Sequence, residues 1–310
     1  MRLRIVFLGS PEFAVPSLEA LLAREEVVLV VTQPDRPAGR GRSLTAPPVK
    51  RRAQQAGVPV LQPERLKGND ALLAELAAAA PDLIVVVAYG RILPRALLEL
   101  PPRGCINVHA SVLPRYRGAA PIAWAIARGE TSTGITLMQM EAGLDTGPIL
   151  HVRTLPIAPD DTTGTLSEKL SRLGALALAE ALERLKAGTL VPTPQDPALA
   201  THAPPLEKGQ GRVDFGRPAP EVERWIRALD PWPGAETLLE GTPLRLFRPR
   251  VVSGAGAPGR VMGADRDGLL VSCGEGAVGI GELQLPGRRR MPAAALLAGR
   301  PIPIGTVLGG

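Results

Sequence analysis

The chain has 310 residues, of which 45% are hydrophobic and 21% charged, a composition typical of globular proteins and unlike that of disordered chains. Its formal net charge of +6 favours an acidic partner such as nucleic acid. Its two cysteines, Cys105 and Cys273, are too few and too far apart for a disulfide framework or a zinc site of the usual spacing.

The first half of the chain alternates short apolar runs with helical segments. Apolar runs that predict strands lie at residues 4–9, 27–33, 81–90, 105–111 and 134–140. Helical patterns lie at residues 17–22, 71–80 and 165–185. This order predicts an α/β fold with a Rossmann-like open, mostly parallel sheet that carries helices on both faces.

The composition changes after residue 188. Residues 188–205 contain five prolines and almost no periodicity, which predicts a linker that crosses the surface. A helical pattern follows at 220–229, and short strand patterns separated by glycine-rich turns lie at 243–252, 268–274 and 278–285. Such short strands predict a small, OB-like C-terminal β-barrel. We therefore expect one domain over 1–188, a linker over 189–205 and a second domain over 206–310.

Asn107 and His109 lie two positions apart in the predicted strand 105–111. Residues i and i+2 of a strand share a face, and the ligand crevice of an open α/β sheet lies at the carboxyl ends of its strands. A neutral imidazole can accept a proton there, and an amide can donate to a developing oxyanion. The pair suits attack on a carbonyl group, although an isolated pair of this kind is more often a buried histidine beside a turn asparagine.

Two neighbouring segments strengthen the active-site interpretation. The segment EAGLDTGPI, residues 141–149, carries Asp145 between Gly143 and Gly147, so a turn there can return a carboxylate to the same sheet edge. A carboxylate beside His109 would orient its ring. The irregular segment after the pair ends at Gly118, whose missing side chain allows a ligand to approach the backbone closely.

Six segments of the chain together resemble the methionyl-tRNA formyltransferase family. They span nearly the whole chain in the family's order, and their combination is far more specific than any one of them. They read FLGSPEFAVPSL, TQPDRPAGRGR, VVVAYGRILP, CINVHASVLPRYRGAAPI, TGITLMQMEAGLDTGPIL and IRALDPWPGA. The resemblance implies that the first domain transfers a formyl group from 10-formyltetrahydrofolate to the α-amine of methionine on initiator tRNA, with no metal, and that the C-terminal domain binds the tRNA.

The resemblance also implies roles for individual residues. Asn107, His109 and Asp145 match the family's catalytic triad, in which the histidine takes a proton from the attacking amine, the asparagine stabilises the oxyanion and the aspartate holds the histidine. The residues that match its folate-binding segments are Ser111, Val112, Leu113, Pro114, Tyr89, Gly90, Ile92 and Gly118. Val112 replaces the family's more frequent Leu, and Phe215 stands where the family commonly has Trp, which leaves the packing there in doubt.

Two basic segments are candidates for contacting the tRNA. Residues 33–52 interrupt the βα order with a local charge of +5, from Asp35 against Arg36, Arg40, Arg42, Lys50, Arg51 and Arg52. A loop of this length inside a compact domain is usually functional, and the resemblance implies that it reaches the acceptor end, with Arg40 as the sharpest candidate. Residues 288–290, with Arg289 at their centre, form the second cluster, although a charge run can also be a solvated turn.

Other functions stay open at this point. A related folate-dependent formyltransferase, or a 10-formyltetrahydrofolate hydrolase, acting on a small molecule would share Asn, His and Asp but would not need the basic segment or the added barrel. A third hypothesis is a nucleic-acid-binding protein whose Rossmann-like half is inactive. The opening apolar run ends at Gly9 and Pro11, too short for a signal peptide or a membrane span, so we expect a cytoplasmic protein with no membrane association. We also expect a monomer.

Overall fold

The computed structural model describes residues 2–38, 43–265 and 268–309. The chain forms two compact units whose segments alternate along the sequence. The first unit comprises residues 1–121, 133–155 and 167–203, and the second comprises residues 122–132, 156–166 and 204–310. Within the described ranges, no helix is long and apolar enough to cross a membrane.

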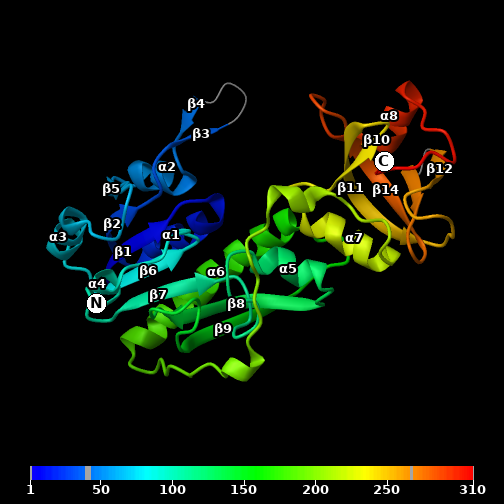
Figure 1. Cartoon of the computed structure of the whole chain (residues 1–310). Coiled ribbons are helices and arrows are strands. Elements are labelled where there is room, and N and C mark those ends of the chain that lie inside the picture. Colours follow the sequence, from blue (N-terminus) through cyan, green and yellow to red (C-terminus); the bar gives the residue numbers. More distant parts are fainter. Residues whose placement is uncertain (1, 39–42, 266–267, 310) are drawn as a thin grey trace. The chain divides into compact units, whose positions relative to one another are not determined.

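A seven-stranded sheet in the order β5-β2-β1-β6-β7-β8-β9 forms the centre of the first unit (Figure 1). Strands β5, β2, β1, β6 and β7 pair in parallel, and β8 runs antiparallel to β7, so the predicted Rossmann-like sheet is confirmed. All five residues of β6 are buried, as a strand covered on both faces requires. The strands are β1 Arg4–Gly9, β2 Glu26–Val31, β5 Val60–Leu61, β6 Leu83–Val87, β7 Cys105–His109, β8 Ser132–Gln139 and β9 Ile149–Pro156.

The helices of this unit follow the predicted alternation. Asn69 accepts the Leu72 N–H at 3.0 Å and so caps α3. Cys105 is buried beside α4, and burial raises the pKa of its thiol to about 12, so the thiol stays protonated. The helices are η1 Glu12–Ala14, α1 Val15–Arg24, α2 Pro48–Gln55, α3 Asp70–Ala78, α4 Arg95–Leu98, η2 Pro197–Leu199 and the part of α6, Thr163–Lys186, that begins at Ser167.

The basic segment 33–52 is more structured than the single loop that its sequence predicted. Strands β3, Arg36–Ala38, and β4, Ser43–Thr45, pair antiparallel, and α2 begins at Pro48. Proline fits the first turn of a helix, where its missing N–H costs nothing. At the base of the hairpin, Lys50 and Gln62 donate to the Asp35 carboxylate at 2.8 Å, and these bonds lower its pKa. Lys50 is therefore engaged within the protein.

The second unit contains an antiparallel sheet in the order β10-β11-β14-β13-β12, and β15 pairs with β14. The sheet curls into a half-barrel, in line with the predicted barrel-like domain, and α7 and α8 pack against it. The helices and strands are η3 Lys208–Gly211, α7 Ala219–Ala228, β10 Glu236–Leu239, β11 Thr242–Val252, β12 Val261–Asp265, β13 Gly268–Ser272, β14 Ala277–Gln284, β15 Met291–Pro292 and α8 Ala293–Gly299. Helix α5, Pro121–Ala127, also belongs to the second unit from residue 122 onward.

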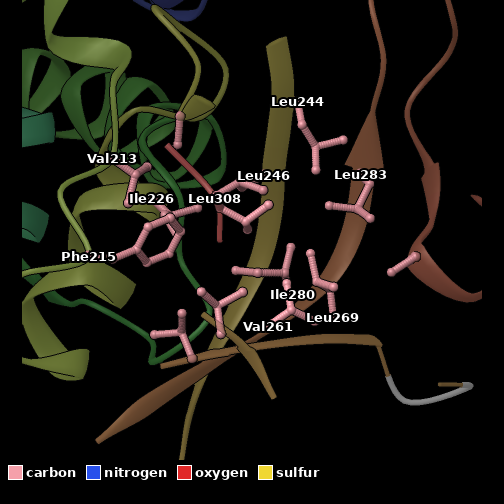
Figure 2. Packing of buried hydrophobic residues seen from close by; sticks show 14 of the residues in the cluster. Val213, Phe215, Ile226, Leu244, Leu246, Val261, Leu269, Ile280, Leu283 and Leu308 are labelled. Carbon is pink, nitrogen blue, oxygen red and sulfur yellow. The ribbon is translucent and has the colours of Figure 1, made fainter. Parts of the chain in front are cut away.

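The core of the second unit resolves the question of Phe215. Its ring is only 5% exposed and belongs to a buried cluster with Ile226 of α7 and with Leu246 and Ile280 of the sheet (Figure 2). Phenylalanine therefore fills this core position with an apolar ring, and the packing is continuous where the family more often has a larger aromatic residue.

Candidate active site

His109 is the last residue of β7, and its side chain is 6% exposed. Its Nε2 atom lies 2.9 Å from the carbonyl oxygen of Tyr116. Because a carbonyl can only accept, Nε2 carries the hydrogen of the neutral ring, and the lone pair is on Nδ1. The loop after β7 thus selects the tautomer in which Nδ1 can act as a base.

Asp145 lies in the turn after β8, close to that nitrogen. Its Oδ2 atom is 3.6 Å from His109 Nδ1 and accepts the Gly118 backbone N–H at 2.9 Å. The backbone of Asp145 has a φ of 51°, a left-handed conformation that aspartate tolerates better than most residues. With a side chain 13% exposed, the carboxylate is partly shielded from water and faces the imidazole. The turn therefore brings the acid to the sheet edge, as its two glycines predicted.

Asn107 occupies the position two residues before His109 in the same strand, so it lies on the same face of the sheet. It is half-buried between Val86 of β6 and Met138 of β8, its partners in the register. The half-buried Asn107, a histidine base with a fixed tautomer and the partly shielded Asp145 carboxylate thus lie toward the carboxyl end of β7. This set of groups can accept a proton, donate to an oxyanion and stabilise an imidazolium.

The loop after β7 is held by its own polar groups. The Ser111 hydroxyl is buried and donates to the Arg115 carbonyl at 2.6 Å, while the Leu113 N–H donates to Thr136 Oγ1 at 3.0 Å. The side chains of Ser111 and Leu113 are buried, and the Ser111 carbonyl also accepts the Thr136 hydroxyl at 2.7 Å. The partly exposed Val112 and Pro114 are therefore the side chains of this loop best placed to contact a ligand.

The loop after β6 shows the same division between buried and available groups. Tyr89 is 2% exposed and packs in the core of the first unit, and its carbonyl accepts a hydrogen bond from Gln33 Nε2 at 3.0 Å. Gly90 has a φ of +75° that favours glycine, and Ile92 is 88% exposed.

The predicted linker 189–205 is not a free surface crossing over its whole length. The Arg117 N–H donates to the Thr201 carbonyl at 2.8 Å, the Ala203 N–H donates to the Arg117 carbonyl at 2.7 Å, and Thr201 Oγ1 accepts the Tyr116 N–H at 2.9 Å. The segment pairs with the loop after β7 because each backbone group there needs a partner. The proline-rich composition of the segment did not indicate this pairing.

The arginines predicted to contact tRNA have different surroundings. Arg36 is exposed at the start of β3, whereas Arg40 and Arg42 lie outside the described residues. Arg289 is exposed, and within the described part of the chain it forms no ion pair. Its neighbour Arg290 pairs with Asp230 at 3.0 Å and with Glu282, and stacks 4.1 Å from the centre of the Phe247 ring. Arg290 is thus a structural residue of the half-barrel.

Comparison with known proteins places the chain in a family. Residues 3–182 match the formyl transferase family, and residues 205–301 match its C-terminal domain. The methionyl-tRNA formyltransferase of Trichlorobacter lovleyi is 51% identical over 98% of this chain and 96% of its own length. That of Geobacter sulfurreducens is 52% identical over 99% of this chain and 97% of its own length.

A solved structure shares the fold at lower identity. HypX from Aquifex aeolicus, crystallised with tetrahydrofolic acid, superimposes on 96% of this chain with a TM-score of 0.65 and 21% identity. This chain corresponds to 47% of the length of HypX. The full-length identity to two curated relatives, together with the matched N- and C-terminal family domains, places the chain in the methionyl-tRNA formyltransferase family.

Proposed function

We propose that this protein transfers the formyl group of 10-formyltetrahydrofolate to the α-amine of methionine esterified to initiator tRNA. The observation that carries the proposal is the 3.6 Å approach of Asp145 to the free Nδ1 of His109, at the carboxyl edge of the sheet, in a chain of this family. The likeness of the fold to a protein crystallised with tetrahydrofolic acid supports a folate donor.

The residues of the site divide the chemistry among them. His109 Nδ1 accepts a proton from the methionyl ammonium, and the amine nitrogen forms a bond to the formyl carbon. The Asn107 amide donates to the oxygen that becomes negative, a contribution typically worth about 3 kcal/mol for one donor. As the carbon–nitrogen bond to the folate breaks, the imidazolium gives its proton to the leaving nitrogen. The attacking nitrogen loses its second proton to water as the formamide forms. Asp145 stabilises the imidazolium between these steps. No step needs a metal, since the formyl group on the folate is already activated.

The loops after β6 and β7 suit the apolar part of a folate. Ile92 is largely exposed, Val112 and Pro114 are partly exposed, and all three follow strands that end at the same sheet edge as His109. Apolar side chains with a few fixed polar groups are the usual lining of a small-molecule site. We propose that Tyr89, Gly90, Ser111, Leu113 and Gly118 shape this site. Their bonds within the protein, such as those of the Leu113 and Gly118 N–H groups, hold the two loops in place.

An assay with two acceptors tests the proposed function. The protein is incubated with the formyl donor and either methionyl-tRNA or glycinamide ribonucleotide, and formylated product is measured. Formylmethionine on the tRNA, without formylation of the nucleotide, is the expected result. Formylation of the small acceptor alone would overturn the assignment in favour of a small-molecule formyltransferase.

For the tRNA we propose contacts from Arg36 of the β3–β4 hairpin, from Arg40 and Arg42, and from Arg289 of a C-terminal tRNA-binding domain over 206–310. The catalytic domain spans 1–188 in this proposal, residues 189–205 link the two, and the protein works as a cytoplasmic monomer. Guanidinium groups that bind phosphates release counterions, so the affinity for tRNA should fall steeply as salt is added. A flat response in a gel-shift titration would contradict the backbone contacts.

Arg289 and Arg290 offer a matched pair of variants. Arg289→Ala is expected to weaken tRNA binding about 3- to 10-fold and reduce the salt slope by about one, while leaving thermal unfolding unchanged. Arg290→Ala removes two ion pairs and a cation–π contact, and should lower the free energy of unfolding by about 1–2 kcal/mol. Gel shifts and thermal melts of both variants check this, and equal effects in both assays would contradict the division of roles.

A further inference from the structure

Gln195 ties the linker to the turn that carries Asp145. Its Nε2 atom donates to the Asp145 carbonyl at 2.9 Å and to the Gly147 carbonyl at 2.7 Å. Both hydrogens of one amide group are thus spent on two carbonyls of the same turn. The contact joins residues 48 to 50 positions apart in the chain.

Arg117 fixes the direction in which this amide points. Its Nε and Nη2 atoms donate to Gln195 Oε1 at 3.1 and 2.7 Å. Two donors on one side and two acceptors on the other leave a single orientation for the amide, because the reversed orientation would set N–H against N–H and oxygen against oxygen. Arg117 is itself only 8% exposed, and its backbone is paired with Thr201 and Ala203. Gln195 and Arg117, which we call the clamp, are therefore anchored in a buried part of the first unit.

The turn needs such a clamp for a local reason. Asp145 has a left-handed backbone, which aspartate tolerates better than most residues but which still favours a turn held by its surroundings. The carboxylate accepts a hydrogen bond from the Gly118 N–H and lies 3.6 Å from His109 Nδ1. A small rotation of the backbone at Asp145 would therefore carry the carboxylate away from the imidazole.

We propose that Gln195 is a positioning residue of the active site, which acts through Asp145, with Arg117 holding its amide in register. The inference rests on the proposed function, because it assumes that Asp145 supports His109 during formyl transfer. The linker segment around Gln195 then holds Asp145 in place for catalysis, without itself contacting the formyl donor or the acceptor amine.

Two substitutions separate positioning from simple folding. Gln195→Ala removes the clamp, and Gln195→Glu keeps the size and adds an ion pair with Arg117 but replaces the donors with an oxygen that faces two carbonyls. Both should lower kcat about 10- to 100-fold, since a misplacement of about 1 Å can cost that much, with each KM within about 2-fold of the wild-type value. The thermal unfolding midpoint of Gln195→Glu should fall by only a few degrees, because the new ion pair with Arg117 offsets part of the loss of the two hydrogen bonds.

A double-mutant cycle with Asp145→Ala tests whether the effect runs through the carboxylate. Residues that act as one unit are non-additive, so adding Gln195→Ala to Asp145→Ala should change kcat by less than about 2-fold. Asp196→Ala is the matched control: its exposed side chain caps the Ala198 N–H at 2.9 Å in the same linker, and it should keep the wild-type rate.

The outcomes discriminate between the two proposals. Two results would overturn the positioning role and leave the proposed function standing. One is wild-type turnover in both Gln195 variants. The other is a decrease in kcat on Gln195→Ala by the same factor whether or not the Asp145 carboxylate is present. Near-normal turnover of Asp145→Ala itself would overturn both the catalytic role of Asp145 and the inference drawn from it. Failure of the wild-type protein to formylate methionyl-tRNA would overturn the proposed function.

Discussion

Replacing His109 with alanine is expected to lower kcat for formyl transfer about 10²- to 10⁴-fold, the range that a general acid–base residue supplies. The variant loses the base at the sheet edge whose tautomer is fixed by a 2.9 Å hydrogen bond to the Tyr116 carbonyl. Because that ring is buried, a cavity of moderate cost remains, and the melting temperature must be measured beside the rate. The measurement is single-turnover formylation of methionyl-tRNA.

His151 provides the matched control for this experiment. It pairs with Glu180 at 2.9 Å on the surface of the first unit, away from β7. His151→Ala therefore removes an imidazole without touching the proposed chemistry, and an exposed ion pair contributes about 1 kcal/mol or less to stability. A folded His109→Ala protein that turns over as fast as His151→Ala would remove His109 from the mechanism.

Gly147→Ala is expected to lower kcat about 100-fold or more and to destabilise the first unit. A β-carbon at residue 147 would lie 1.8 Å from the Gln139 carbonyl oxygen, far inside contact distance. The turn cannot absorb the clash by a side-chain rotation, because the neighbour is backbone and the Gln139 N–H is bound to the Pro148 carbonyl at 2.9 Å. The backbone must move, Asp145 moves with it, and a shift of about 1 Å at a catalytic group costs about 10²-fold.

Gly299→Ala serves as the control for that substitution. No atom lies within 4 Å of a β-carbon built there, and alanine is the better helix former at the end of α8. The two variants should differ in both kcat and melting temperature. Equal behaviour of the two proteins would show that the turn tolerates a β-carbon and that its tight packing does not hold Asp145 in place.

Much of the first unit was predictable because its apolar residues follow clear strand and helix patterns along the sequence. The run 81–90 reads as a continuous apolar strand, and β6 is buried at every position. The approach of Asp145 to His109 could be anticipated as well, since two glycines frame the acid just after the neighbouring strand. In both cases a local pattern is enough, because the sheet itself determines which ends meet.

What could not be predicted depends on pairing over long sequence distances. Gln195 lies among prolines in a stretch without periodicity, and no local rule connects it to a turn 50 residues earlier. The segments 122–132 and 156–166 likewise belong to the second unit although they lie inside the predicted first domain. The β3–β4 hairpin escaped notice because strands of three residues carry almost no alternation.

The pairing of residues 114–120 with 201–203 has a practical meaning for anyone who trims this protein. A fragment cut at residue 188, where the composition changes, would retain the proposed catalytic and folate-binding residues but would lose the backbone hydrogen bonds that hold the loop after β7. In such a fragment, the turn that carries Asp145 would lack its hydrogen bonds from Gln195. Any shortened version intended for crystallisation or inhibitor screening should therefore run to at least residue 203.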